Sequence, residues 1–172
     1  MQRMSMIDPA NATGKTKDFM DSLKKSMGKV PNIFKVIAHS PASIQMYVGI
    51  KQALDKGVLS AKIKEGIAIL SAEINKCNYC LTAHTVIGKL SGLTGEEIER
   101  NKKADSSDAK TKAILQFAMS VINNRGTVSD EEYKRMRNAG VSEEETIEII
   151  AEITLSIFTN YVNVVANTEI DF

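Results

Sequence analysis

The chain has 172 residues, of which 43% are hydrophobic, and carries 22 Lys and Arg against 21 Asp and Glu. This length suits about one domain, and the apolar content is enough for a core. A net charge of +1 offers no bulk attraction for nucleic acid or an anionic membrane, so neither is an expected partner.

The start of the chain shows no targeting signal. Residues 1–12 lack an apolar h-region and a periodic pattern, so we expect an extended or poorly ordered arm before a single domain over 13–172. The most apolar later stretch, Ile153–Ala166, is too short and too interrupted by Asn160 and Asn163 to span a bilayer. We therefore expect no membrane contact and a cytoplasmic location.

Four helices are predicted before the first cysteine, from apolar residues that recur every three or four positions and from the caps that precede them. The expected ranges are 16–27, 32–38, 41–54 and 61–74. The fourth helix is apolar on nearly every side, which is typical of a central helix. Its two internal glutamates, Glu65 and Glu73, are therefore candidates for a functional role.

The chemistry of the chain is concentrated in Cys77, Cys80 and His84. The two cysteines, which are the only ones, lie two residues apart at the start of a predicted helix that ends near Leu90. Free N–H groups at such a helix start favour the thiolate. His84 follows Cys80 by one turn, so a base lies on the same helical face. The spacing predicts a redox pair in a reducing compartment rather than a secreted disulfide framework.

Four residues, Glu65, Cys77, Cys80 and His84, fit the pattern E-x11-C-x2-C-x3-H, and the neighbouring segments INKCNYCLTAH, SGLTGEEIE and FTNYVN support the fit. The pattern resembles the active site of the carboxymuconolactone-decarboxylase-like family in its alkylhydroperoxidase-D-like branch, over most of residues 28–168. The resemblance implies an all-helical thiol peroxidase or disulfide reductase in antioxidant defence, which needs no flavin or haem. It also implies a hydroperoxide substrate, a lipoyl-type or thioredoxin-type dithiol reductant, and a homo-oligomer, either a trimer or a hexamer.

Within this pattern we expect Cys80 to be activated through His84, with Glu65 supporting the imidazole. Cys77 is then the disulfide partner nearer to solvent. The helix N-terminus should lower the pKa of Cys77 more strongly, so the reverse assignment of the two cysteines stays open. Glu65 is preferred to Glu73 because the family pattern places its glutamate there; geometry alone does not choose between them.

Three further side chains are candidates for supporting roles. Tyr79 stands between the cysteines, where the better-known alkylhydroperoxidase D proteins have a histidine. Asn160 and Asn163 lie in an apolar helix and need hydrogen-bond partners when buried. Ordinary bonding between helices or subunits is as good an explanation for these two amides as a role in the site.

The second half of the chain is also predicted to be helical. Thr94 and Glu97 predict a capping box for a short helix, a polar loop follows over 101–108, and Ser129 and Ser142 begin the last two helices. The final helix is apolar on too many sides for a surface helix, which favours burial and a homo-oligomer. No segment alternates like a strand, so the predicted class is all-α.

The cysteine pair also has other interpretations. Two buried structural thiols would need no further chemistry, and zinc could use Cys77, Cys80 and His84, with His39 as the only other histidine for a fourth position. A thioredoxin-like domain is excluded because the chain lacks a βαβ pattern. A decarboxylase is less expected because the cysteines have no evident use there. The main alternative to an enzyme is a non-enzymatic redox-responsive scaffold or interaction protein.

Overall fold

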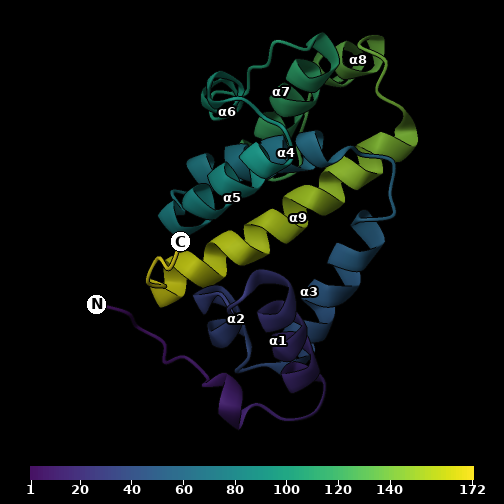
Figure 1. The fold of residues 1–172 in the computed structure, drawn as a ribbon. Helices are drawn as coiled ribbons and strands as arrows, with labels where there is room; N and C mark the ends of the chain where they lie inside the picture. Colours follow the sequence, from purple (N-terminus) through teal and green to yellow (C-terminus); the bar gives the residue numbers. More distant parts are fainter.

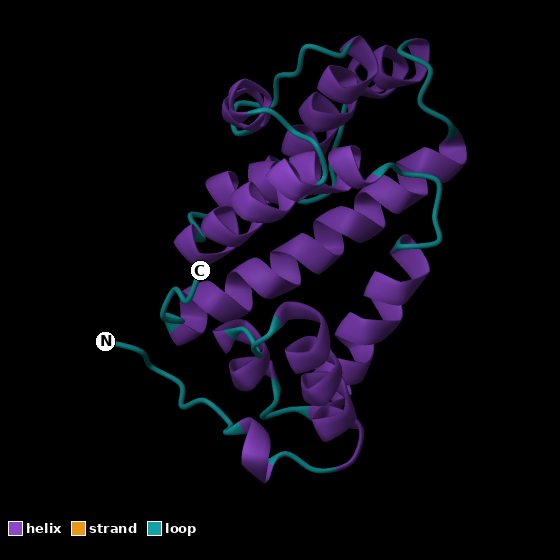
Figure 2. Cartoon of the chain, viewed as in Figure 1, coloured by secondary structure: helices purple, strands orange, loops and turns teal.

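Helices account for all the regular structure in the computed structural model, which describes residues 1–172 (Figure 2). The predicted all-α class is confirmed. In chain order the elements are the 3-10 turn η1 (Pro9–Asn11), α1 (Gly14–Met27), α2 (Asn32–Ile37), α3 (Pro41–Leu54), α4 (Ala61–Ile74), α5 (Asn78–Leu90), α6 (Gly95–Asn101), α7 (Ala109–Asn123), α8 (Asp130–Asn138) and α9 (Glu143–Ala166).

The long helix α9 is the axis of the fold. It packs against α2, α3, α4, α5 and α7, with α4 and α5 along one side and α1, α2 and α3 along the other (Figure 1). One apolar cluster lies among α1, α2, α3 and α5 and contains both cysteines. A second cluster lies among α4, α7, α8 and α9. The site residues therefore sit where the first cluster meets the central helix.

The same helix is longer than the stretch that we considered too short to span a bilayer. By length and composition α9 is long and apolar enough to cross a membrane, and it is the only such helix. Half of its most apolar window is buried inside the protein, as in the core helix of a soluble domain. Composition alone is therefore weak evidence for a membrane span.

Close packing of α4 on α5 depends on Gly88 at the crossing. A Cβ atom added at Gly88 would lie 3.2 Å from Leu93 and 3.4 Å from Ile69, tighter than ordinary van der Waals contact. The Cβ atom of Glu65 lies 3.9 Å from the same point. The glycine thus lets α4 approach α5 closely enough for Glu65 to reach the face of α5 that carries His84.

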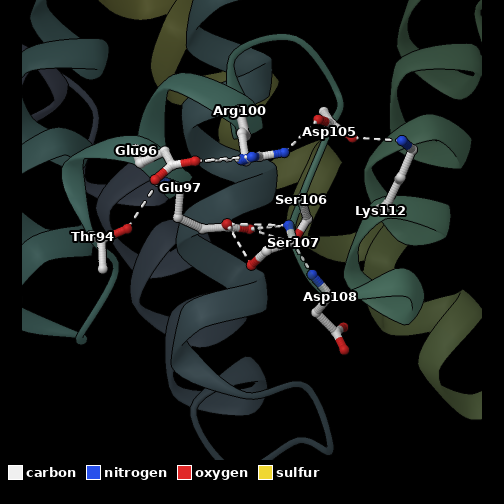
Figure 3. A network of polar contacts seen from close by, with 9 residues as sticks. All are labelled: Thr94, Glu96, Glu97, Arg100, Asp105, Ser106, Ser107, Asp108 and Lys112. Carbon is white, nitrogen blue, oxygen red and sulfur yellow. Dashed lines mark hydrogen bonds and ion pairs between the residues drawn. The ribbon is translucent and has the colours of Figure 1, made fainter.

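Helix starts follow the predicted caps, with one correction. The side chains of Ser40, Ser60, Thr94, Ser129 and Ser142 each accept a backbone N–H bond at the start of α3, α4, α6, α8 and α9. The predicted capping box at Thr94 is only half formed, because Glu97 does not return to it. Its carboxylate instead accepts bonds from Ser106 and Ser107 across the loop (Figure 3). This contact holds the 102–108 loop against α6.

The N-terminal arm follows the surface of α2 and the end of α9. The Arg3 backbone N–H donates to the Ala166 carbonyl at 2.7 Å, and that of Ile7 donates to the Lys35 carbonyl at 3.0 Å. Most of the arm is extended, with the short η1 turn at its end. The division into an arm over 1–12 and one domain over 13–172 stays a prediction.

Candidate active site

The two cysteines lie at the turn between α4 and α5. Cys77 is the N-cap of α5, and its sulfur accepts a hydrogen bond from the Cys80 backbone N–H at 3.2 Å. A disulfide joins the two side chains, with the Cα atoms 5.3 Å apart. Reduction leaves two thiols beside the free N–H groups of a helix N-terminus, where the thiolate form is favoured.

Both cysteines are buried, which corrects one expectation. Cys77 is 2% exposed and Cys80 is 3% exposed, so Cys77 is not the cysteine nearer to solvent. The reason is that the Cys77 side chain turns back over its own helix end to cap it, and lies in the apolar cluster with Ala72 and Tyr79. Cys80 faces a cavity that Cys77 does not line.

This apolar cavity has a volume of about 320 Å³ and lies between α1, α2, α3, α5 and α9. His84 lines it one turn after Cys80, so the sulfur and the imidazole face one space. Most of the remaining wall is aromatic or aliphatic, formed by residues such as Phe19, Leu23, Ile33, Phe34, Ile87 and Phe172. A cavity of this kind suits an apolar molecule that brings one polar reactive group.

The imidazole of His84 is held by Glu65 from the neighbouring helix. The His84 Nδ1 and Glu65 Oε2 atoms lie 2.8 Å apart. An ionised carboxylate only accepts hydrogen bonds, so Nδ1 carries the proton in this pair and Nε2 is left to accept one. The structure therefore brings together the carboxylate of Glu65, the imidazole of His84 with Nε2 free to accept a proton, and the sulfur of Cys80.

Asn163 on α9 contacts the sulfur of Cys80 directly. Its Nδ2 donates to Cys80 Sγ at 3.2 Å, and its Oδ1 is buried without a partner. An N–H bond to sulfur stabilises the charged thiolate over the thiol. Asn160 lies one turn earlier and accepts from Asn75 Nδ2 at 3.0 Å, so it holds the α4–α5 turn rather than the sulfur.

Tyr79 ties the C-terminal tail, defined here as residues 168–172, to the cysteine turn. Its hydroxyl donates to Asp171 Oδ1 at 2.8 Å and accepts from the Ile33 backbone N–H at 3.3 Å. The Phe172 ring packs edge-on against Tyr79 with centroids 5.4 Å apart. Burial and the bond to Asp171 raise the pKa of Tyr79 above its usual range, so this side chain is a neutral phenol that positions the tail.

Two residues considered from the sequence do not reach this site. Glu73 is exposed and makes no side-chain hydrogen bond, so the structure favours Glu65 as the carboxylate beside His84. His39 lies at the N-terminal arm, where its Nε2 is 2.9 Å from the Ser5 carbonyl oxygen. It is therefore not placed as a fourth zinc ligand, and no group of three or more His, Cys, Asp and Glu residues is arranged to hold a metal ion.

One buried carboxylate was missed at the sequence level. Glu152 on α9 is 8% exposed and lines a second, polar cavity that also contains Glu65 and His84. The available signal was its position in the apolar run of the last helix, the same signal that drew attention to Asn160 and Asn163. A charged residue among apolar neighbours is unusual in a buried face unless it has a partner or a function.

Comparison with known families identifies the segment that holds this site. Residues 41–101 match the carboxymuconolactone decarboxylase family. The resemblance expected from the motif is confirmed, and the matched span includes Glu65, Cys77, Cys80 and His84. Comparison with curated protein sequences gives no match.

Several solved structures share the fold of nearly the whole chain, beyond the segment that matches the family. The alkylhydroperoxidase AhpD core of an uncharacterized peroxidase-related protein from Ralstonia eutropha JMP134 is 20% identical, over 99% of this chain and 92% of that chain, with a TM-score of 0.89. An uncharacterized peroxidase-related protein from Silicibacter sp. TM1040 is 23% identical, over 98% and 90%, with a TM-score of 0.81. The debrominase Bmp8, in a complex with 2,3,4-tribromopyrrole, is 20% identical, over 98% and 91%, with a TM-score of 0.78. These likenesses establish an AhpD-type fold.

Proposed function

We propose that the protein is a thiol-dependent peroxidase and disulfide reductase, which reduces hydroperoxides through Cys77 and Cys80 in antioxidant defence. The observation that carries the proposal is the constellation at one cavity: Cys80 faces the same space as His84, and Glu65 holds the imidazole at 2.8 Å. A nucleophile, a base and a group that orients the base are the parts that thiol catalysis requires. The AhpD-type fold supports the same conclusion.

The chemistry is a two-electron reduction of the peroxide. The Cys80 thiol gives its proton to His84, and the thiolate attacks one peroxide oxygen; an S–O bond forms, the O–O bond breaks, and the leaving alkoxide takes the proton as an alcohol. The Cys77 sulfur then attacks Cys80. The S–S bond forms, the S–O bond breaks, and the hydroxide leaves as water with the Cys77 proton. An external dithiol restores both thiols by exchange.

The surroundings of Cys80 favour an organic hydroperoxide with an apolar body as the oxidant. The cavity wall is mostly aromatic and aliphatic, and a small polar peroxide would gain little from it. The reductant is proposed to be a lipoyl-type or thioredoxin-type dithiol. The proposed location is the cytoplasm, because dithiol reductants keep thiols reduced there.

A second candidate function is reductive dehalogenation of an aromatic compound. The favouring observation is the same apolar cavity, together with the likeness in fold to a debrominase. The electron balance is equivalent: two thiols and an aryl bromide give a disulfide, the debrominated ring and hydrogen bromide. Under the non-enzymatic alternative, a redox-responsive scaffold, the disulfide would form without turnover.

The test is consumption of an organic hydroperoxide by the full chain with excess dithiol. We expect turnover that is lost in Cys80→Ser and Cys77→Ser, and lowered at least about a hundredfold in His84→Ala, because general-base assistance is worth about a hundredfold to ten-thousandfold. Glu73→Gln is the matched control for Glu65→Gln, and only the latter should lower turnover. If the wild type forms the disulfide once and does not turn over with any dithiol supplied, the result would support the redox-responsive scaffold instead. Bromide release from a bromoaromatic compound, without peroxide turnover, would support the dehalogenase.

A further inference from the structure

Glu152 is a buried carboxylate that the mechanism above does not use. Glu152 is only 8% exposed, and its side chain makes no hydrogen bond within the protein. Burial without a partner is costly for an ionised carboxylate. A buried ionisable group that faces a cavity is a feature of functional sites.

Glu152 lines a cavity that His84 also lines. It has a volume of about 240 Å³, most of its lining residues are polar, and Glu65 and His84 line it with Glu152. His84 also lines the apolar cavity in front of Cys80. His84 thus lines both spaces, the first with Cys80 and the second with two carboxylates.

The charged groups around Glu152 do not neutralise it fully. Besides Glu152, the titratable side chains of this cavity are Tyr47 and Lys51 from α3, Asp55 at its C-cap, Lys64 and Glu65 from α4, and His84 from α5. Lys51 pairs with Asp55 and Lys64 lies 3.6 Å from it, while Lys64 also donates to the Leu54 carbonyl at 2.9 Å. Both cations are therefore engaged at Asp55 rather than at Glu152.

Two carboxylates that share a small cavity disfavour double ionisation. Burial raises the pKa of Glu152 to about 7, and the charge of Glu65 adds to this effect against the opposing effects of His84, Lys51 and Lys64. Glu152 therefore holds a proton more readily than an exposed glutamate does. The polar cavity has room for the water through which such a proton can move.

We propose that Glu152 and Glu65, in the cavity that they share with His84, take up one proton as a carboxylate pair, and that this pair stores the proton of Cys80 during the reaction. The inference rests on the proposed function. When the Cys80 thiolate forms, its proton passes to His84 Nε2, and the Nδ1 proton passes to the carboxylate pair. When the alkoxide leaves, the transfers reverse and the alcohol forms, so the pair is unchanged at the end. Glu152 does not touch the substrate; it acts on the proton through His84.

The experiment compares the wild type with Glu152→Gln and Glu152→Asp, with Glu144→Gln on the exposed first turn of α9 as the control. The chain has only two histidines, so NMR of labelled imidazoles can follow His84 as a function of pH. We expect the His84 titration curve to change shape in Glu152→Gln, because the ionisation of a neighbouring carboxyl near neutral pH is lost from its surroundings. Glu152→Asp should recover most of the wild-type curve, and Glu144→Gln should match it.

The rate of Cys80 oxidation by an organic hydroperoxide is measured on the same proteins in a single turnover. We expect the pH–rate profile of Glu152→Gln to lose one of its two ionisation steps. Near neutral pH this variant should react about tenfold more slowly than the wild type, a smaller effect than loss of the base His84 would cause. A His84 titration that is identical in wild type and Glu152→Gln, or changed equally in Glu144→Gln, would overturn the proposal. If no protein reacts with peroxide, the proposed function fails, while the imidazole titration still decides whether Glu152 is coupled to His84.

Discussion

Asn163 is the side chain that touches the sulfur of Cys80 without belonging to the sequence motif. Its bond to Sγ at 3.2 Å should stabilise the thiolate, since hydrogen bonds to charged groups contribute about 1.5–3 kcal/mol. We predict that Asn163→Ala slows alkylation of reduced Cys80 about tenfold near neutral pH, and that Asn163→Asp slows it further through like-charge repulsion.

The measurement is the rate of iodoacetamide labelling as a function of pH. Asn160→Ala is the matched control, because Asn160 is also a buried amide on α9 but bonds to Asn75. Equal effects of the two alanine substitutions would show that the N–H bond to sulfur does not set the reactivity.

Glu152 also couples folding to pH. Its pKa rises from 4.5 to about 7 on burial, so between these pH values the folded chain holds a proton that the unfolded chain has lost. The free energy of unfolding therefore falls as the pH rises through this window and is level above it. Glu152→Gln should be more stable than the wild type above pH 7, by up to about 3 kcal/mol, and should lose this advantage below pH 4.5.

Urea unfolding at a pH on each side of the window tests this prediction, with Glu144→Gln as the control for a lost charge on the same helix. A stability difference between Glu152→Gln and wild type that is the same at both pH values would contradict it.

At the scale of elements, the C-terminal tail is held against the cavity by Tyr79. The Tyr79 hydroxyl bonds to Asp171, and Lys29 lies 4.7 Å over the ring of Phe172. Tyr79→Phe removes the hydroxyl bonds at a cost of about 1 kcal/mol. We predict faster amide hydrogen exchange in residues 168–172, with the exchange of α4, α5 and α9 unchanged. Tyr161→Phe, at an exposed tyrosine on α9, should leave the tail as it is; equal exchange in both variants would mean that the Tyr79 hydroxyl does not hold the tail.

Helix boundaries were predictable because their causes are local. Ser40, Ser60, Ser129 and Ser142 bond to N–H groups three residues on in the chain, so short stretches of sequence contain the whole signal. Glu97 shows the limit of this reasoning. Its carboxylate had a local partner available at Thr94 but bonds across the loop to Ser106 and Ser107 instead, a choice that depends on how the loop folds back.

The candidate site was predictable in part for the same reason. Cys77, Cys80 and His84 lie within two helical turns, so their common face follows from periodicity. Glu65 could be chosen over Glu73 only through the family pattern, because the contact with His84 depends on the crossing of two helices at Gly88. Glu152 was hidden in an apolar run, and its cavity exists only where α3, α4, α5 and α9 meet.

At the scale of the whole molecule, α9 carries apolar side chains that the chain does not cover. Ile147, Ile150, Tyr161, Val164 and Val165 on this helix are exposed. An exposed set of this kind marks an interaction surface, which agrees with the predicted homo-oligomer; the trimer or hexamer stays a prediction. We predict that Val165→Glu lowers the mass measured by light scattering to that of a smaller assembly.

The matched control is Leu90→Glu at the end of α5, where an apolar side chain is exposed on a different helix. Circular dichroism should show unchanged helix content in both variants. A wild-type protein that is monomeric at micromolar concentration would contradict the prediction of an oligomer.

The central claim is that Cys80 is the sulfur that reacts with peroxide, activated at the cavity that it shares with His84. The most direct test is mass spectrometry of single-cysteine variants after one equivalent of organic hydroperoxide in the presence of a sulfenic-acid trap. We predict a trapped adduct on Cys80 in Cys77→Ser and no appreciable adduct on Cys77 in Cys80→Ser. An adduct on Cys77 with none on Cys80 would contradict the account and assign the reacting sulfur to the helix cap.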